Sequence, residues 1–256
     1  MAVESLYKLR FFEILNFIAK LVLGLKEAFY SLFFEKRFFS VTFLENLRKI
    51  VWGSLPIATL TVGSSAIVYS IHAAPAFGER GLSVYLGGMV ALALIREGVP
   101  VMGSLAVISQ YCSGVTAQIG SMKVTDQLDA MKIAKVLPHS YFLLPMILAG
   151  LIGFPIIILI CIVFGLVVNF FTTNLLINIS YNLYTSSIFN TIELKDLFLA
   201  IIKASIFGFF VTLISYNCGV QAKGGSKEVG SATRLSVVIN FAGVIILDYI
   251  ITVLWL

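Results

Sequence analysis

The stretch EGVPVMGSLAVISQYCSGVTAQIGSMKVTDQLDAMKIAKVLP, residues 97–138, decides how the rest of the chain can fold. It starts at the charged pair Arg96-Glu97 of an apolar segment, runs through small residues and ends in the polar segment 122–135. The chain turns apolar again at Tyr141. This order predicts a membrane helix that emerges as a short charged helix, about residues 122–136, before the chain re-enters the membrane. Such a hairpin is suited to transmit force.

The composition identifies an all-α integral membrane protein. Hydrophobic residues make up 59% of the 256 residues and charged residues only 12%, with a mean hydropathy of +0.99. Soluble domains carry about 25% charged residues, so this chain lacks the polar surface to stay in water. Its length allows one membrane domain of several helices. The net charge of +5 reflects basic loops beside membrane segments and does not indicate nucleic-acid binding.

The cysteines and histidines do not form a metal or redox motif in the sequence. Cys112, Cys161 and Cys218 fall in or beside separate apolar segments and form no C-x-x-C pair. We therefore interpret them as small buried hydrophobes. His72 and His139 are isolated, so the sequence shows no zinc-type cluster.

The N-terminal segment, residues 4–35, is apolar but interrupted by charge. Its polar residues are spaced 3, 4, 7 and 4 apart, which places them on one helical stripe: Glu13, Asn16, Lys20, Glu27 and Ser31. This pattern predicts an amphipathic helix in the membrane interface, with a tilted spanning helix as the alternative. We expect residues 1–45 to form this helix and a basic connector, and residues 46–256 to form the permeation domain.

Hydropathy predicts five spanning helices of about membrane length. We expect a turn at residues 72–81 and an interface-hugging loop at residues 169–196. The predicted spans are Ile50–Ile71, Leu82–Tyr111 or beyond, Tyr141–Val168, Leu197–Cys218 and Leu235–Leu256.

The basic residues predict the orientation of these spans. One side carries Lys123, Lys132 and Lys135 in the second loop, Lys223, Lys227 and Arg234 in the fourth, and Arg48 and Lys49 before the first span, against Arg80 and Lys195 on the other. The positive-inside rule therefore predicts a cytoplasmic N-terminus and a periplasmic C-terminus.

Arg96 and Glu97 are the first candidates for a functional site, because a charge deep in a span is costly and usually faces a protein interior or a wet cavity. Adjacent helix residues point about 100° apart, so at least one of the two needs a partner on another helix or subunit. Gly98 permits close approach, and Pro100 removes an amide donor and can bend the helix. A substrate cavity and a structural ion-pair network both explain this pattern.

The polar segment 122–136 is predicted to be a capped helix. Thr125 is the expected N-cap, with Asp126 and Asp129 near the positive end of the helix dipole. Lys132 and Lys135 fall in the expected last turn, and Asp129 can pair with Lys132. Spacing alone favours an amphipathic connector on the membrane, and a docking helix for a cytoplasmic partner is the alternative.

The fourth loop, GVQAKGGSKEVGSATR at residues 219–234, is not a phosphate-binding loop. Gly219 and Gly224 have the right spacing, but Gly225 stands where the lysine is required, and the loop joins two membrane helices. The sequence contains no other nucleotide motif and no catalytic constellation. Lys203 is expected to snorkel to the headgroups, and Asp248 is expected to lie in the hydrated outer interface.

Two separated motifs resemble those of the MlaE/YrbE family, the permeases of MCE-type lipid ABC transporters. The first is Arg96-Glu97 followed by GSMKVTDQLDAMKIAKVLPHSYFLLP, residues 120–145. The second is the fourth loop, whose matching residues include Gly224, Gly225, Gly230 and Arg234. Asp248-Tyr249 and Thr252 match the pattern of the last helix. The resemblance covers roughly residues 45–256.

The resemblance implies a five-span homodimeric permease of the bacterial inner membrane. A cytoplasmic ABC ATPase is expected to bind ATP and Mg, so this chain needs no cofactor of its own. A periplasmic MCE-domain protein completes the expected complex, which moves phospholipid or a related lipid between the inner and outer membranes. The resemblance also implies a lipid cavity and an ATPase-coupling helix. The expected cavity residues are Tyr69, Arg96, Glu97 and Pro100, and the expected coupling residues are Lys123, Thr125, Asp126, Gln127, Asp129 and Lys132.

The sequence departs from the family pattern at several positions. Where the family commonly has Arg, then Glu eight residues later, this chain has Gln110 and Gln118. Loss of both charges together is consistent with a neutralised pair. Other departures are the shifted glycine Gly98, and His139, Met146 and Ser231.

The leading hypothesis is a non-catalytic permease subunit driven by a separate ATPase. A secondary transporter or channel without an ATPase predicts inverted repeats, and none is evident. A membrane-embedded lipid enzyme requires a catalytic constellation, and the sequence shows none.

Overall fold

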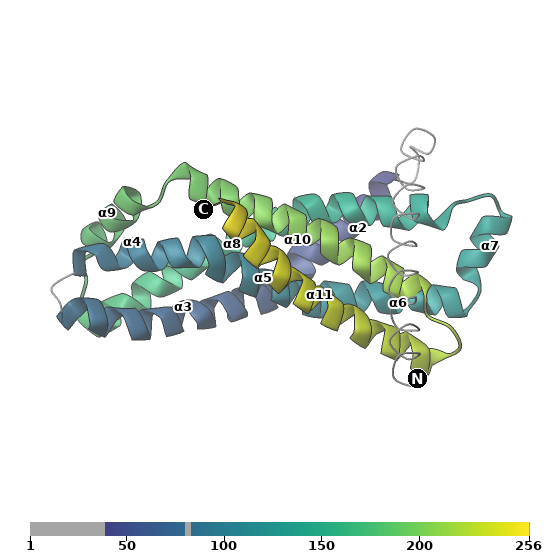
Figure 1. Cartoon of the computed structure of the whole chain (residues 1–256), viewed down its shortest axis with the longest axis horizontal. Helices are drawn as coiled ribbons and strands as arrows, with labels where there is room; N and C mark the ends of the chain where they lie inside the picture. The colour runs from purple at the N-terminus through teal and green to yellow at the C-terminus, as the bar shows by residue number, and fades with distance from the viewer. Residues whose placement is uncertain (1–38, 80–82, 256) are drawn as a thin grey trace, which may run out of the picture.

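The computed structural model of the chain describes residues 39–79 and 83–255 (Figure 1). The expected N-terminal interfacial helix, residues 4–35, therefore lies outside the described residues. Within them the regular structure is helical, and short π-helical segments (η) interrupt the α-helices. The elements are α2 (Phe39–Arg48), η1 (Lys49–Gly53), α3 (Ser54–Glu79), α4 (Ser83–Ala93), η2 (Leu94–Gly98), α5 (Val99–Val107), η3 (Ile108–Cys112), α6 (Ser113–Val124), α7 (Gln127–Ile133), η4 (His139–Leu143), α8 (Leu144–Ile177), α9 (Tyr181–Thr191), α10 (Leu194–Val220) and α11 (Ser226–Trp255).

These elements join into five helices that are long and apolar enough to cross a membrane, as the sequence predicts. They are Val41–Phe77, Tyr85–Val124, His139–Ile177, Leu194–Val220 and Ser226–Trp255. The second and fourth loops lie at one end of the bundle, the α7 end, so their basic residues gather there (Figure 1).

The first three helices are longer than the membrane requires. They contain 37, 40 and 39 residues, which is about 55–60 Å of helix against a hydrocarbon core of about 30 Å. Parts of α3, α4 and α8 extend past the start of α10, where α9 packs on α4 (Figure 1). The predicted turn at 72–81 is wrong, because α3 runs through Pro75 to Glu79. The predicted loop at 169–196 is also wrong, because α8 continues to Ile177 and α9 follows.

Glycines set the closest helix contacts. A Cβ atom at Gly150 of α8 would lie 2.6 Å from the carbonyl oxygen of Gly208 of α10. A Cβ at Gly88 of α4 would lie 2.6 Å from the carbonyl oxygen of Ser187 of α9. Any larger residue at either position would push the helices apart, so these glycines fix α10 on α8 and α9 on α4.

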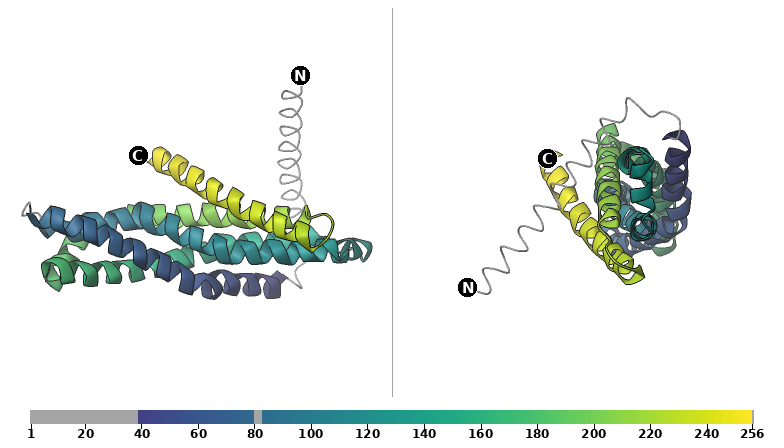
Figure 2. Two further views of the ribbon diagram at one scale, coloured as in Figure 1. Left: turned by 90° about the horizontal axis from the view of Figure 1, so that it is seen from below. Right: turned by 90° about the vertical axis from the view of Figure 1, so that its right-hand side faces the viewer.

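Helix α11 is the least covered of the five spans. Only 11% of its most apolar stretch is buried, against 39–61% for the other four. It packs on α6 and α10, and it is tilted so that its C-terminal end diverges from the other helices (Figure 2). Its exposed side chains include Ile245, Tyr249 and Val253. No residue of the described part of the chain covers these apolar side chains, a surface suited to contact with lipid or protein.

Candidate functional site

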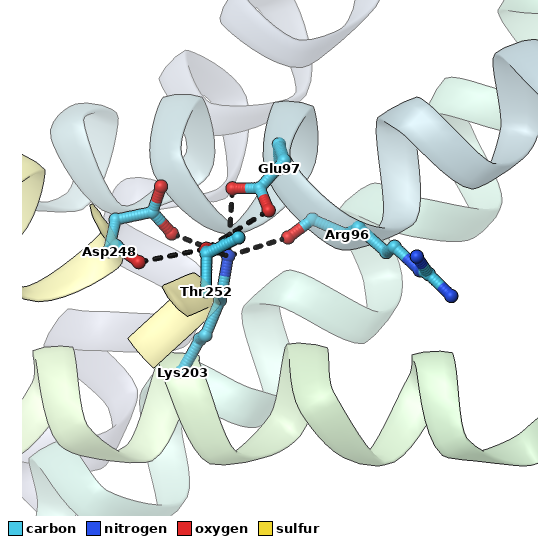
Figure 3. Close-up of polar contacts among 5 residues, drawn as sticks. All are labelled: Arg96, Glu97, Lys203, Asp248 and Thr252. Atoms are coloured by element: carbon cyan, nitrogen blue, oxygen red, sulfur yellow. Dashed lines mark hydrogen bonds and ion pairs between the residues drawn. The ribbon is translucent and has the colours of Figure 1, made fainter. Parts of the chain in front are cut away.

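A buried lysine joins three of the spanning helices (Figure 3). The side chain of Lys203 on α10 is 0% exposed, and its Nζ atom lies 2.8 Å from Glu97 Oε2 of η2 and 2.8 Å from Asp248 Oδ1 of α11. It also donates to Thr252 Oγ1 at 2.8 Å. We call Glu97, Lys203, Asp248 and Thr252 the lysine cluster. The expectations that Lys203 snorkels and that Asp248 relies on interfacial water are wrong, because the two residues neutralise each other inside the protein.

Pro100 supports the lysine cluster through the backbone. A proline has no amide hydrogen, so the carbonyl oxygen of Arg96, four residues earlier, receives no α-helical hydrogen bond from it. That oxygen instead accepts a hydrogen bond from Lys203 Nζ at 3.0 Å. Pro100 itself is buried. Pro100 therefore contributes by leaving the Arg96 carbonyl oxygen free to bind Lys203, and its own side chain does not line an open surface.

Arg96 points to a different partner from its neighbour Glu97. Its Nε and Nη2 atoms each lie 2.7 Å from Asp196 Oδ1. Asp196 is buried at the start of α10, and its other oxygen accepts from the backbone N–H of Glu193 at 2.9 Å as part of a capping box. The prediction that at least one of the charged pair needs a partner on another helix is confirmed, since both have one.

The exposed part of the lysine cluster is acidic. The side chain of Glu97 is 42% exposed and that of Asp248 is 16% exposed, whereas Lys203 is inaccessible. Lys203 has three N–H donors and four acceptors around it. Tyr69 lies beside this region, because a Cβ at Gly98 would be 3.3 Å from its ring. Of the predicted cavity residues, Tyr69 therefore neighbours the backbone that carries Arg96 and Glu97, whose side chains take separate partners.

A second charge network holds α7 against the end of α6. Asp129 Oδ2 lies 2.6 Å from Lys123 Nζ, and Asp129 Oδ1 lies 3.1 Å from Lys132 Nζ. The predicted pair of Asp129 with Lys132 is confirmed. The hydrogen bonds from Lys123 and then Lys132 hold the pKa of Asp129 below its ordinary value of 3.8. We call these three residues the aspartate cluster.

The helix boundaries around α7 differ from the prediction. Thr125 is the C-cap of α6, with its hydroxyl donating to the Ser121 carbonyl oxygen at 2.9 Å, and is not the N-cap of α7. The N-cap is Asp126, in the left-handed conformation at φ 56°. Lys135, predicted in the last turn, lies beyond it because α7 ends at Ile133. The charged segment 122–136 is therefore a broken helix.

The α7 helix presents a mixed surface. Leu128 is buried, whereas Ile133 is 85% exposed. Asp126 and Gln127 are exposed at the other end of the helix. A surface that combines an exposed large apolar side chain with polar residues is common at protein contacts.

A family model described as Permease MlaE matches residues 43–254. The chain belongs to the MlaE permease family.

Several relatives of this MlaE permease carry related names. A probable ABC transporter permease protein of Rickettsia typhi is 31% identical over 82% of this chain and 81% of its own length. A probable ABC transporter permease protein of Synechocystis is 29% identical over 83% and 80%, respectively. Protein TRIGALACTOSYLDIACYLGLYCEROL 1 of Arabidopsis thaliana, described as chloroplastic, is 29% identical over 82% of this chain and 60% of its own length.

The fourth loop of the permease is shorter than predicted. The α10 helix continues to Val220 and α11 begins at Ser226. Gly230 and Arg234 therefore lie in α11, and Gly224 and Gly225 form the turn. Gly224 has φ +101°, a left-handed conformation that favours glycine. The loop is exposed at the α7 end.

The remaining candidates have structural explanations. Cys112, Cys161 and Cys218 are free and buried, as predicted. Among residues 39–79 and 83–255 there is no group of three or more His, Cys, Asp or Glu side chains that could hold a metal ion. Sequence reasoning did not predict that Lys203 and Asp248 belong to this site. It could have done so, because Arg96 and Glu97 require charged partners and Lys203 and Asp248 are the other charged residues within the predicted spans.

Proposed function

We propose that the protein is the permease subunit of an ATP-driven ABC transporter that moves phospholipid or a related lipid between the inner and outer membranes. The observation that carries this proposal is the family match over residues 43–254, which spans all five long helices. The name of the plant relative contains the name of a galactolipid, which supports a lipid substrate.

The proposed complex divides the work among chains. A cytoplasmic ABC ATPase binds ATP and Mg, and a periplasmic MCE-domain protein exchanges the lipid. Two copies of the permease enclose the lipid cavity in the bacterial inner membrane, with the N-terminus and the α7 end facing the cytoplasm. The weakly covered face of α11 supports a contact with the second copy or with lipid.

We infer that α7 is the contact through which the ATPase acts on the cavity. The helix Tyr85–Val124 is continuous, and Val124 lies about 40 Å along it from Glu97. A displacement of α7 is therefore transmitted to Glu97 along one continuous helix. Because Glu97 is linked to α10 and α11 through Lys203, a shift of this helix changes the contacts of the lysine cluster. ATP can favour one arrangement only by binding it more tightly than the other.

The test is reconstitution of the full-length permease with its ATPase and MCE-domain partner. We expect stoichiometric co-purification of the ATPase, and ATP-dependent lipid transfer between vesicles that carry the complex and acceptor vesicles. Glu97→Ala is expected to reduce bound lipid and transfer without dissociating the complex. Transfer that proceeds at the same rate without the ATPase would instead favour a secondary transporter or channel.

A further inference from the structure

A small cleft opens between the first and second long helices, away from the lysine cluster. Its volume is about 240 Å³, and it is lined by Lys49, Gly53, Gln110, Tyr111, Gly114, Val115 and Gln118. Gln118 lies 22 residues from Arg96 along a continuous helix, which is about 33 Å, or one hydrocarbon thickness. The cleft therefore lies on the α7 side of Arg96, about one hydrocarbon thickness further along the second long helix.

The polar groups of the cleft favour an anion. Within the described part of the chain, its lining includes one cation, Lys49, and no carboxylate. Lys49 Nζ donates to Gln118 Oε1 at 3.3 Å and lies 2.9 Å from Glu45, one helical turn away on the same helix. Gln110 and Gln118 are exposed and carry amide donors. The hydroxyl of Tyr111 donates to Asn46 Oδ1 at 3.0 Å, so it is already used inside the protein.

Two glycines keep the cleft open. No described atom lies within 4 Å of a Cβ placed at Gly53 or Gly114. By contrast, a Cβ at Gly120, two turns further along α6, would lie 3.2 Å from Val229. Glycine is unfavourable inside a helix, and packing among the described residues does not require it at Gly53 or Gly114. No described residue fills this space, so a ligand can enter it.

We propose that this cleft binds the phosphate of an anionic phospholipid in the leaflet on the α7 side. Basic pockets between membrane helices on the cytoplasmic side bind anionic headgroups. Trp52, next to Lys49 and 69% exposed, is a residue type enriched at the membrane interface. The inference rests on the proposed orientation, but it does not require that the protein transports lipid.

Gln118 affects the charge of the cleft. A glutamate at position 118 would place a second carboxylate beside Lys49, in addition to Glu45. Gln118 keeps the contact with Lys49 without adding negative charge.

The test is native mass spectrometry of the full-length protein in detergent, with phosphatidylglycerol, phosphatidylcholine or inorganic phosphate added separately. The wild type is expected to retain phosphatidylglycerol in preference to phosphatidylcholine. Lys49→Ala and the isosteric Gln118→Glu are each expected to reduce retention about fivefold. Gly114→Leu is expected to reduce it by filling the cleft. Ser121→Glu is the matched control, because it adds the same charge one turn outside the cleft and is expected to retain the lipid.

Three results would overturn the proposal. Gln118→Glu could retain phosphatidylglycerol as well as the wild type does, or inorganic phosphate could bind while phosphatidylglycerol does not. Alternatively, Gly114→Leu could dissociate a dimer in light scattering without changing lipid retention, which would assign the cleft to a second copy. ATP-dependent transfer measured on the same variants separates this proposal from the proposed function, since loss of headgroup retention with normal transfer leaves the latter intact.

Discussion

The lysine cluster and the aspartate cluster contain the same number of charged residues in opposite arrangements. In the first, one cation, Lys203, lies between Glu97 and Asp248. In the second, one anion, Asp129, lies between Lys123 and Lys132. The central residue of the first is 0% exposed, whereas all three side chains of the second reach solvent.

This difference in burial determines what each cluster contributes. A buried charge that loses its partners is strongly destabilising, so the lysine cluster ties η2, α10 and α11 into one unit. An exposed ion pair contributes little and is screened by salt. The aspartate cluster therefore positions α7 without anchoring it firmly, which suits a helix proposed to move with a partner.

The largest effect is expected from Lys203→Met. It removes the cation and leaves Glu97 and Asp248 without a counter-charge, which we expect to destabilise the fold by about 3–5 kcal/mol. Thermal unfolding of the purified protein in detergent measures the loss. Lys132→Met is the matched control at the aspartate cluster and is expected to change the unfolding temperature far less. Equal shifts in the two variants would show that burial does not separate the clusters.

A smaller effect is expected from Glu97→Gln. The amide keeps the shape of the side chain, and Asp248 still neutralises Lys203, so we expect a loss of about 1–3 kcal/mol. Bound lipid is expected to fall at the same time, because Glu97 is the more exposed acid of the cluster. Thermal unfolding and lipid mass spectrometry on one sample measure both. Unchanged lipid with reduced stability would make Glu97 purely structural.

The two clusters also differ in how far the sequence predicts them. Asp129 and Lys132 are three residues apart, so helix geometry alone pairs them. Glu97 and Lys203 are 106 residues apart, and nothing in local spacing brings them together. Hydropathy predicts the number of spans, including the fifth. It does not predict where the helices end, because α3, α4 and α8 are longer than the membrane thickness from which the predicted ends were set. The contact of Gly150 with Gly208 likewise depends on tertiary packing.

A functional effect without a large loss of stability is expected from Asp129→Lys. The substitution replaces two attractions with repulsion from Lys123 and Lys132, and so reorients α7. We expect ATPase association to weaken by up to about tenfold, while membrane insertion is unchanged. Co-purification of the ATPase measures this, with Lys195→Asp at the opposite end of the bundle as the control. ATPase recovery equal to that of the wild type would count against the docking role of α7.

The smallest effect is the pH dependence of α7. The pKa of Asp129 in the folded protein is below its ordinary value of 3.8 because Lys123 and Lys132 stabilise the carboxylate. Its stabilising contribution is therefore complete above that ordinary value and is lost as the pH falls through the lowered pKa. Hydrogen exchange of residues 127–133, corrected for the intrinsic rate, should show constant protection from pH 7 to pH 5 and a loss below about pH 4. In Asp129→Asn this acid-dependent step should disappear. If the step persists in that variant, another group controls the opening of α7.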